Sequence, residues 1–372
     1  MGIPSYFSSV VKKHGKILKP LSFYEPQFFQ NMYMDCNSII YDAVRTIEQP
    51  SENFEMKLIQ NVIETIESYI KLISPSNTIY IAFDGVAPFA KMNQQWTRRF
   101  KGDFMAKNTF VNNTSTSEWS TANITPGTDF MNNLSRIITR HFDNKEKIYN
   151  ARKIIVSASD IRGEGEHKIF QYIRDINNKD ENMLLYGLDS DLIMLTIFNR
   201  QYYNKGYIFR EAPAFMNVNS DIKPDDKEPY VVDIEGMCSQ LVIEMDCCVN
   251  EFRRVYDYVF ICFLLGNDFL PHFPGLNIRT HGLDTLMQIY RKRIGNKPDL
   301  FIIKDDMTIN WRVFKLLIQD IADNEHVYII DEYKLRDRFS KRRWKVDTEK
   351  EREYAFNSIP LIERNIEYYI CP

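Results

Sequence analysis

The sequence predicts an α/β fold in which a mainly parallel, twisted sheet is flanked by helices. Two observations carry this prediction. Short apolar segments without helical spacing alternate with amphipathic segments of helical spacing, and carboxylates follow several of the apolar segments. Buried parallel strands are continuous apolar runs, and strands that alternate with helices are typical of a sheet covered on both faces.

Four short apolar segments are predicted to be the buried strands: residues 31–35, 78–84, 153–157 and 183–189. Between the first two, one apolar stripe predicts a long helix, and its members are Ile59, Val62, Ile63, Ile66, Ile70 and Ile73. A second stripe after Glu164 predicts another helix, with Ile169, Phe170, Ile173 and Ile176 on its apolar face.

Two segments depart from this alternation. A helix that begins near Lys91 leads into residues 107–125, which are rich in Asn, Thr and Ser, so residues 91–125 are predicted to form a protruding helical arm. From about residue 300 the pattern changes to mixed helices with a basic run at 334–345. We therefore expect one domain over residues 1–300 and a mainly helical extension over residues 301–372.

The composition is that of an ordinary folded protein. The 372 residues are 44% apolar and 26% charged, with a net charge of -3 and a pI of about 6.1. A nucleic-acid surface must therefore come from local basic patches. Six cysteines without CxxC spacing predict reduced thiols in the cytoplasm, or alternatively in the nucleus. The longest apolar run, residues 259–265, is too short to span a membrane.

Seven carboxylates in five clusters are the candidate metal ligands and catalytic residues: Asp35, Asp84, Glu164, Glu166, Asp189, Asp191 and Asp268. Ligands of open α/β sheets collect beyond the carboxyl ends of the strands, where the aspartates that follow the predicted strands lie. Glu164 and Glu166 stand at the start of a predicted helix, whose positive end favours anionic groups. If the strand continued through Asp189 and Asp191, both side chains would lie on one face.

Clustered carboxylates are typical ligands of divalent metal ions. Mg²⁺ and Mn²⁺ take oxygen ligands, and two such ions about 4 Å apart can activate a water and stabilise the leaving oxygen of a phosphodiester. A single Asp after a strand is more often a turn former or a helix cap. Five clusters in one α/β layout favour the metal site. Asp268 follows an apolar run, so if buried it must be paired or bound to a metal.

A basic helix face follows Asp84. Its members Lys91, Gln95, Arg98 and Arg99 stand at i, i+4, i+7 and i+8, so they share one face. Such a face suits a terminal phosphate. The alternative is a solvated basic face, and the proximity to Asp84 favours the phosphate. Tyr41 is either a stacking platform for a nucleic-acid base or a core tyrosine.

Seven segments together resemble the XRN family of 5′→3′ exoribonucleases over about residues 1–290, the first conserved region of that family. In family order they are MGIPSYF, MDCNSII, AFDGVAPFAKMNQQWTRRF, ITPGTDFM, GEGEHKIFQYIR, YGLDSDLIML and FLLGNDFLPHFPGL. The resemblance implies a PIN/FEN-like nuclease core. It also implies hydrolysis of single-stranded RNA from a 5′-monophosphate end, with release of 5′-mononucleotides.

The resemblance also implies roles for the candidate residues. The seven acids would hold two catalytic cations, Mg²⁺ or Mn²⁺. Lys91, Gln95, Arg98 and Arg99 would form the 5′-monophosphate pocket of a monomeric enzyme. Tyr41 stands where the family has a stacking histidine. The second conserved region, with its stacking tryptophan, has no recognisable counterpart, so residues 301–372 resemble only its start. The zinc knuckle of the nuclear branch is missing, which favours the cytoplasm.

Two alternative functions stay open. A FEN-like structure-specific 5′ DNA nuclease would share the carboxylates, but the basic block after Asp84 opposes it. A catalytically inactive RNA-binding relative of the XRN enzymes would fit the missing second region. The presence of all seven acids opposes that alternative, because an inactive protein gains nothing from a costly cluster of like charges.

Overall fold

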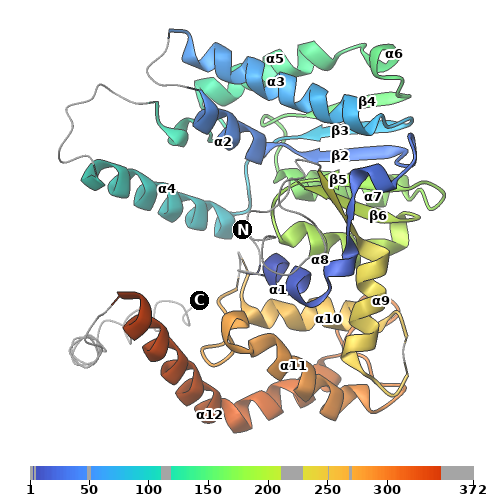
Figure 1. The fold of residues 1–372 in the computed structure, drawn as a ribbon, viewed down its shortest axis with the longest axis vertical. Coiled ribbons are helices and arrows are strands. Elements are labelled where there is room, and N and C mark those ends of the chain that lie inside the picture. Colours follow the sequence, from blue (N-terminus) through green and yellow to red (C-terminus); the bar gives the residue numbers. More distant parts are fainter. Residues whose placement is uncertain are drawn as a thin grey trace.

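The computed structural model describes residues 3, 6–47, 52–109, 119–210, 229–249, 251–267 and 270–344. A seven-stranded sheet of order β1-β7-β6-β5-β2-β3-β4 lies in the upper part of the molecule, to the right of α2 and α4 in Figure 1. Its strands are β1 (Leu18–Pro20), β2 (Asn31–Asp35), β3 (Thr78–Ala82), β4 (Lys153–Ser157), β5 (Met183–Tyr186), β6 (Gly206–Arg210) and β7 (Tyr230–Asp233).

Most of the sheet is parallel, as predicted. The five neighbouring strands β4, β3, β2, β5 and β6 run in one direction, and β7 pairs antiparallel with both β6 and β1 at one edge. Strands β3 and β5 end earlier than expected, at Ala82 and Tyr186. The apolar pattern continues past the last paired residue because Phe83 is also buried, so hydropathy alone overestimates the strand length.

Helices cover both faces of the sheet, and the two predicted stripes are confirmed as α3 and α7. The helices are α1 (Tyr6–Lys13), α2 (Asn37–Thr46), α3 (Phe54–Ile73), α4 (Phe89–Thr109), α5 (Asp129–Phe142), α6 (Glu146–Tyr149), α7 (Gly165–Ile176), α8 (Asp191–Phe198), α9 (Ile234–Met245), α10 (Arg254–Cys262), α11 (Gly282–Tyr290) and α12 (Trp311–Trp344).

Two apolar cores lie on opposite faces of the sheet because successive strand residues point to opposite faces. Met32 and Met34 of β2 pack in the core that includes residues of α2, α3 and α5. Tyr33, between them, belongs to the other core, which is formed with residues of α1 and α7 to α12. Figure 1 shows α3 and α5 above the strands and α8 and α9 below them.

Helix α4 projects away from the carboxyl edge of the sheet (Figure 1), which confirms the helical arm as far as Thr109. Residues 110–118 of the expected arm lie outside the described residues. Among the described residues after 300, the structure has one 34-residue helix, α12, where the pattern predicted mixed helices. Leu317 and Ile321 of α12 lie in the same core as residues of β5. The predicted domain boundary at residue 300 therefore stays a prediction.

Across the part of the chain that is described, every helix falls short of the length and apolar character that crossing a bilayer requires.

Candidate metal and phosphate site

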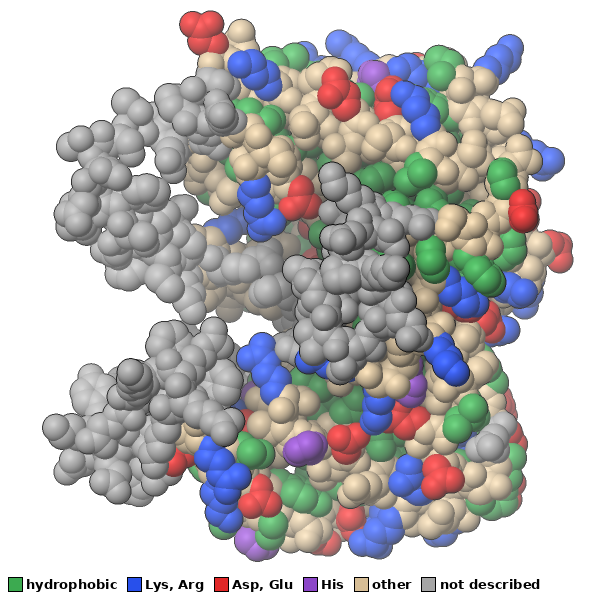
Figure 2. Space-filling view, in the orientation of Figure 1, with side chains coloured by type: hydrophobic (Ala, Val, Ile, Leu, Met, Phe, Trp, Pro, Cys, Tyr) green, Lys and Arg blue, Asp and Glu red, His purple; other side chains and the backbone are tan. Residues whose placement is uncertain are grey.

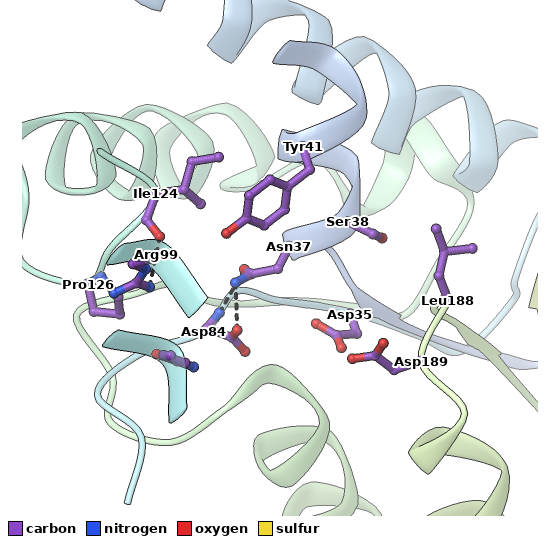
Figure 3. Close-up of a pocket in the computed structure, with 11 residues that line it drawn as sticks. Asp35, Asn37, Ser38, Tyr41, Asp84, Arg99, Ile124, Pro126, Leu188 and Asp189 are labelled. Carbon is purple, nitrogen blue, oxygen red and sulfur yellow. Dashed lines mark hydrogen bonds between the residues drawn. The ribbon is translucent and has the colours of Figure 1, made fainter. Parts of the chain in front are cut away.

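Three of the predicted acids line one cavity of about 200 Å³ at the carboxyl edge of the sheet (Figure 3). Asp35 is the last residue of β2, Asp84 lies two residues beyond β3, and Asp189 lies three residues beyond β5. Because these strands are parallel neighbours, their carboxyl ends meet at one edge. The other lining residues are Asn37, Ser38, Tyr41, Gln95, Arg99, Ile124, Pro126 and Leu188.

The first turn of α7 brings two more acids to this edge. Glu164 immediately precedes the helix and Glu166 lies in its first turn, and both are buried. The backbone N–H of Gly165 donates to Asp84 Oδ1 at 2.7 Å. A Cβ on Gly165 would lie 2.5 Å from Asp35 Oδ1, so only glycine allows the helix to approach this closely.

The strand does not continue to Asp191, so the one-face arrangement of Asp189 and Asp191 does not occur, but Asp191 lies close enough to Glu166 to raise its pKa. Ser190 is in the right-handed helical region and Asp191 opens α8, so the two aspartates are not on one face of a strand. Strand β5 ends at Tyr186, and helix α8 begins at Asp191. Asp268 and the side chain of Arg98 lie outside the described residues, so their roles stay predictions.

The acids interact electrostatically. Burial, followed by the neighbouring carboxylates of Asp84 and Asp189, raises the pKa of Asp35 well above its usual range. Burial, followed by Asp35 and Asp191, does the same to the pKa of Glu166. The pKa of Asp84 is also raised by burial, although the hydrogen bond from Gly165 opposes this. A buried group of like charges attracts either protons or cations.

The donor set fits a divalent cation that prefers oxygen. Asp35 Oδ1 and Glu164 Oε2 are buried, and within the described ranges neither accepts a hydrogen bond. Carboxylate oxygens of this kind are the usual protein ligands of Mg²⁺ and Mn²⁺. These two residues, together with Asp84, Asp189, Glu166 and Asp191, would therefore hold the ions.

One histidine lies beside these acids, and sequence reasoning missed it. Ligand atoms of Glu164, Glu166 and His167 all lie within 4.8 Å of one another. His167 Nδ1 is 3.5 Å from Glu164 Oε2. The sequence signal was the i, i+3 spacing of Glu164 and His167 in GEGEH, because residues at that spacing are neighbours on a helix.

The basic face of α4 divides into two parts. Gln95 and Arg99 line the cavity, and Arg99 Nη2 also donates to the backbone oxygen of Ile124 at 3.3 Å. Lys91 is buried, and its ammonium lies 3.0 Å from Glu164 Oε1. Lys91 therefore compensates one oxygen of one acid, while Gln95 and Arg99 remain at the cavity wall.

Two further residues of α2 complete this wall. Tyr41 lines the cavity and also packs against the core under α2, and its stacking role stays a prediction. Asn37 binds Asp84 through two hydrogen bonds and was missed by sequence reasoning. The sequence signal was the amide two residues after Asp35 in MDCN, which has no distinguishing spacing.

Comparison with known proteins identifies the family of this chain. Residues 1–212 match the family model described as the XRN 5'-3' exonuclease N-terminus, and residues 249–366 match the one described as the Xrn1 helical domain. The first match alone covers more than half of the chain. The protein belongs to the XRN 5'-3' exonuclease family.

Curated relatives named 5'-3' exoribonuclease 2 are similar over most of the chain. The Kluyveromyces lactis protein is 28% identical over 87% of this chain and 39% of its own length. The Gallus gallus protein is 30% identical over 71% of this chain and 34% of its own length. The chain thus spans well under half the length of these relatives.

Among solved structures, the catalytic core of Rad2 in complex with DNA substrate aligns over 97% of this chain and 99% of that chain. The TM-score is 0.42 and the identity is 14%, so nothing about function follows from this likeness.

Proposed function

We propose that the protein is a metal-dependent 5′→3′ exoribonuclease, which hydrolyses single-stranded RNA from a 5′-monophosphate end and releases 5′-mononucleotides. One observation carries the proposal. Asp35, Asp84 and Asp189 line the same cavity as Gln95 and Arg99. Candidate metal ligands and candidate hydrogen-bond donors to the 5′-phosphate therefore face one space. Membership of the XRN family and relatives named exoribonucleases support it.

The acids would hold two Mg²⁺ or Mn²⁺ ions, which would supply an activated water and stabilisation of the leaving oxygen. Arg99 and Gln95, with Lys91 and Arg98 of the same helix, would bind the 5′-phosphate and set the position of the bond that is cut. Tyr41 would stack on a base. Lys91 also offsets the charge of Glu164, so it connects the phosphate-binding face of α4 to a candidate metal ligand.

The decisive experiment compares a 5′-monophosphorylated RNA with its 5′-hydroxyl twin, with and without Mg²⁺ or Mn²⁺. We expect 5′-mononucleotides only from the phosphorylated RNA and only with metal. Asp189→Ala should abolish turnover and leave RNA binding largely intact, because it removes a metal ligand and not a residue that binds the 5′-phosphate. Normal digestion by this variant would contradict the metal-site assignment.

A deoxyribo-oligomer and a binding measurement, added to this experiment, separate the two alternatives. A FEN-like 5′ DNA nuclease would cut a deoxyribo-oligomer of the same sequence in preference to RNA. An inactive RNA-binding relative would bind the phosphorylated RNA without releasing nucleotides. Fractionation and size measurement would test two further parts of the proposal, a cytoplasmic location and a monomer. The free thiols of Cys36, Cys238, Cys247, Cys248 and Cys262 are consistent with a reducing compartment.

A further inference from the structure

Two cations at the carboxyl edge of the sheet bind backbone oxygens rather than lining the cavity. We propose that Arg210 and Lys168 are positioning residues, each of which fixes the carbonyl group of the residue immediately before a candidate metal ligand. Arg210 fixes Leu188, which precedes Asp189, and Lys168 fixes Phe83, which precedes Asp84. The proposal rests on the metal site proposed above and adds residues outside its ligand set.

Arg210 lies at the end of β6, one step beyond the pair formed by Tyr186 and Phe209. Its side chain therefore faces the turn that leaves β5, and Nη2 donates to the backbone oxygen of Leu188. The guanidinium carbon also lies 3.9 Å from the centre of the Phe7 ring of α1. The turn that carries Asp189 is thus held by a planar cation, and that cation is held by the N-terminal helix.

Electrostatics agree with this arrangement. Burial lowers the pKa of Arg210 to about 10, and the largest opposing influence is the carboxylate of Asp189. The charge of Arg210 therefore acts on Asp189 even though the hydrogen bond is to the preceding residue. Arg210 is absent from the residues that line the cavity in Figure 3, so it would act through Leu188 and Asp189.

Lys168 has the corresponding place on the other side of β2. It is buried, and its ammonium donates to the backbone oxygens of Phe83 and Ala158, both at 2.8 Å. These are the first residues beyond β3 and β4. Because Lys168 belongs to α7, its two hydrogen bonds tie the strand end that leads to Asp84 to the helix that begins beside Glu164 and Glu166.

Both contacts restrict the acids in the same way. A fixed carbonyl limits the rotation of the peptide that leads into the acidic residue, and therefore limits where its carboxylate can go. The nearby positive charge also reduces repulsion among the acids before any cation binds. Outer residues that orient metal ligands typically contribute 10- to 100-fold to metal affinity.

The test is a Mn²⁺ titration of the whole chain without RNA, in which electron paramagnetic resonance reports free Mn²⁺. We expect Arg210→Met and Lys168→Met each to weaken Mn²⁺ binding about ten-fold or more, with a cooperative thermal transition retained. Arg210→Lys should recover part of the affinity because it keeps the positive charge. Recovery should be incomplete because the planar contact with Phe7 is lost. Arg45→Met removes an exposed cation of α2 and should leave the affinity unchanged.

Phe7→Leu provides a milder variant should Arg210→Met fail to fold. It leaves Arg210 in place, removes the ring beneath it, and should weaken Mn²⁺ binding less than Arg210→Met. Mn²⁺ affinities of the variants equal to that of the unmodified chain would overturn the inference, as would an unmodified chain that binds no Mn²⁺. RNA digestion is measured separately, so a chain that binds Mn²⁺ but cuts no RNA contradicts the proposed activity alone.

Discussion

The side chain of Asn37 binds Asp84 in both directions: its Nδ2 donates to Asp84 Oδ2 at 2.6 Å, and its Oδ1 accepts from the Asp84 backbone N–H at 3.0 Å. Asp84 Oδ1 meanwhile accepts from Gly165 N at 2.7 Å. The Asp84 carboxylate is therefore fixed from two elements, the start of α2 and the start of α7. An acid fixed in this way presents its remaining lone pairs in one direction.

Removing this amide should impair the site without unfolding the protein. Asn37→Ala frees both the carboxylate and the backbone N–H of Asp84, and we expect the rate of RNA digestion to fall about ten-fold, as for other residues that orient metal ligands. Single-turnover digestion at saturating metal measures this. Asn132→Ala, on the exposed side of α5, is the control and should behave like the unmodified chain. Equal rates for both variants would contradict the orienting role.

Gly165 offers a steric test of the same edge. In Gly165→Ala the new Cβ would lie 2.5 Å from Asp35 Oδ1 and 3.2 Å from Asp35 Cγ, so either Asp35 or α7 must move. We expect Mn²⁺ affinity and RNA digestion to fall together. Gly15→Ala is a matched control, because a Cβ there meets nothing within 4 Å. Unchanged Mn²⁺ affinity in Gly165→Ala would show that Asp35 is not a ligand.

Arg99 should decide which RNA ends are accepted. Arg99→Ala removes a cation from the cavity wall, and a hydrogen bond to a charged group contributes about 1.5–3 kcal/mol. We therefore expect kcat/KM for 5′-monophosphorylated RNA to fall about 10- to 160-fold, with little change for 5′-hydroxyl RNA. Arg136→Ala, an exposed cation of α5, should preserve the preference. If Arg99→Ala kept its preference for 5′-monophosphorylated over 5′-hydroxyl RNA, Arg99 would not be part of the phosphate pocket.

A buried carboxylate away from the cavity should determine stability instead. Asp257 is fully buried and accepts from Tyr290 Oη at 2.5 Å and from the backbone N–H groups of Ile302 and Ile303 at 3.0 and 2.7 Å. Asp257→Asn sets an amide donor against these donors, so we expect a loss of about 3 kcal/mol in the free energy of unfolding. Urea denaturation measures it. Asp323→Asn, which is exposed on α12, should match the unmodified chain.

Acid should destabilise the protein partly through Glu67 of α3. Burial opposes its ionisation, but hydrogen bonds from Tyr149 and His141 outweigh burial and hold the pKa of this carboxyl at about 2, below the usual 4.5. A lowered pKa stabilises the folded state above pH 4.5, and that contribution is lost as the pH falls towards 2. Glu67→Gln should therefore be less stable than the unmodified chain at pH 7.

The difference between the two proteins should shrink between pH 4.5 and about 2. Thermal melting of both proteins at several pH values measures this convergence. A constant difference across that range would show that Glu67 is not held in its ionised form by α5 and α6, from which His141 and Tyr149 come.

Much of the architecture followed from local pattern. The stripes of α3 and α7 and the apolar runs of β2 and β4 are each contained in a few consecutive residues, so hydropathy located them. The strand ends were less predictable. Phe83 is buried, and its N–H still donates to the Ser157 oxygen of β4 although β3 ends at Ala82. Gly187 is buried too, although β5 ends at Tyr186. This is why the one-face arrangement of Asp189 and Asp191 does not occur.

By itself the sequence determined which residues carry charge, which segments form strands and helices, and that acids follow the strands. Only the tertiary structure decided which atoms meet. It paired Lys91 with Glu164, bound Asn37 to Asp84 and bound Arg210 to the backbone oxygen of Leu188, next to Asp189. The physical reason is distance along the chain: strand periodicity is a local property, whereas these contacts depend on how parallel strands and their helices pack.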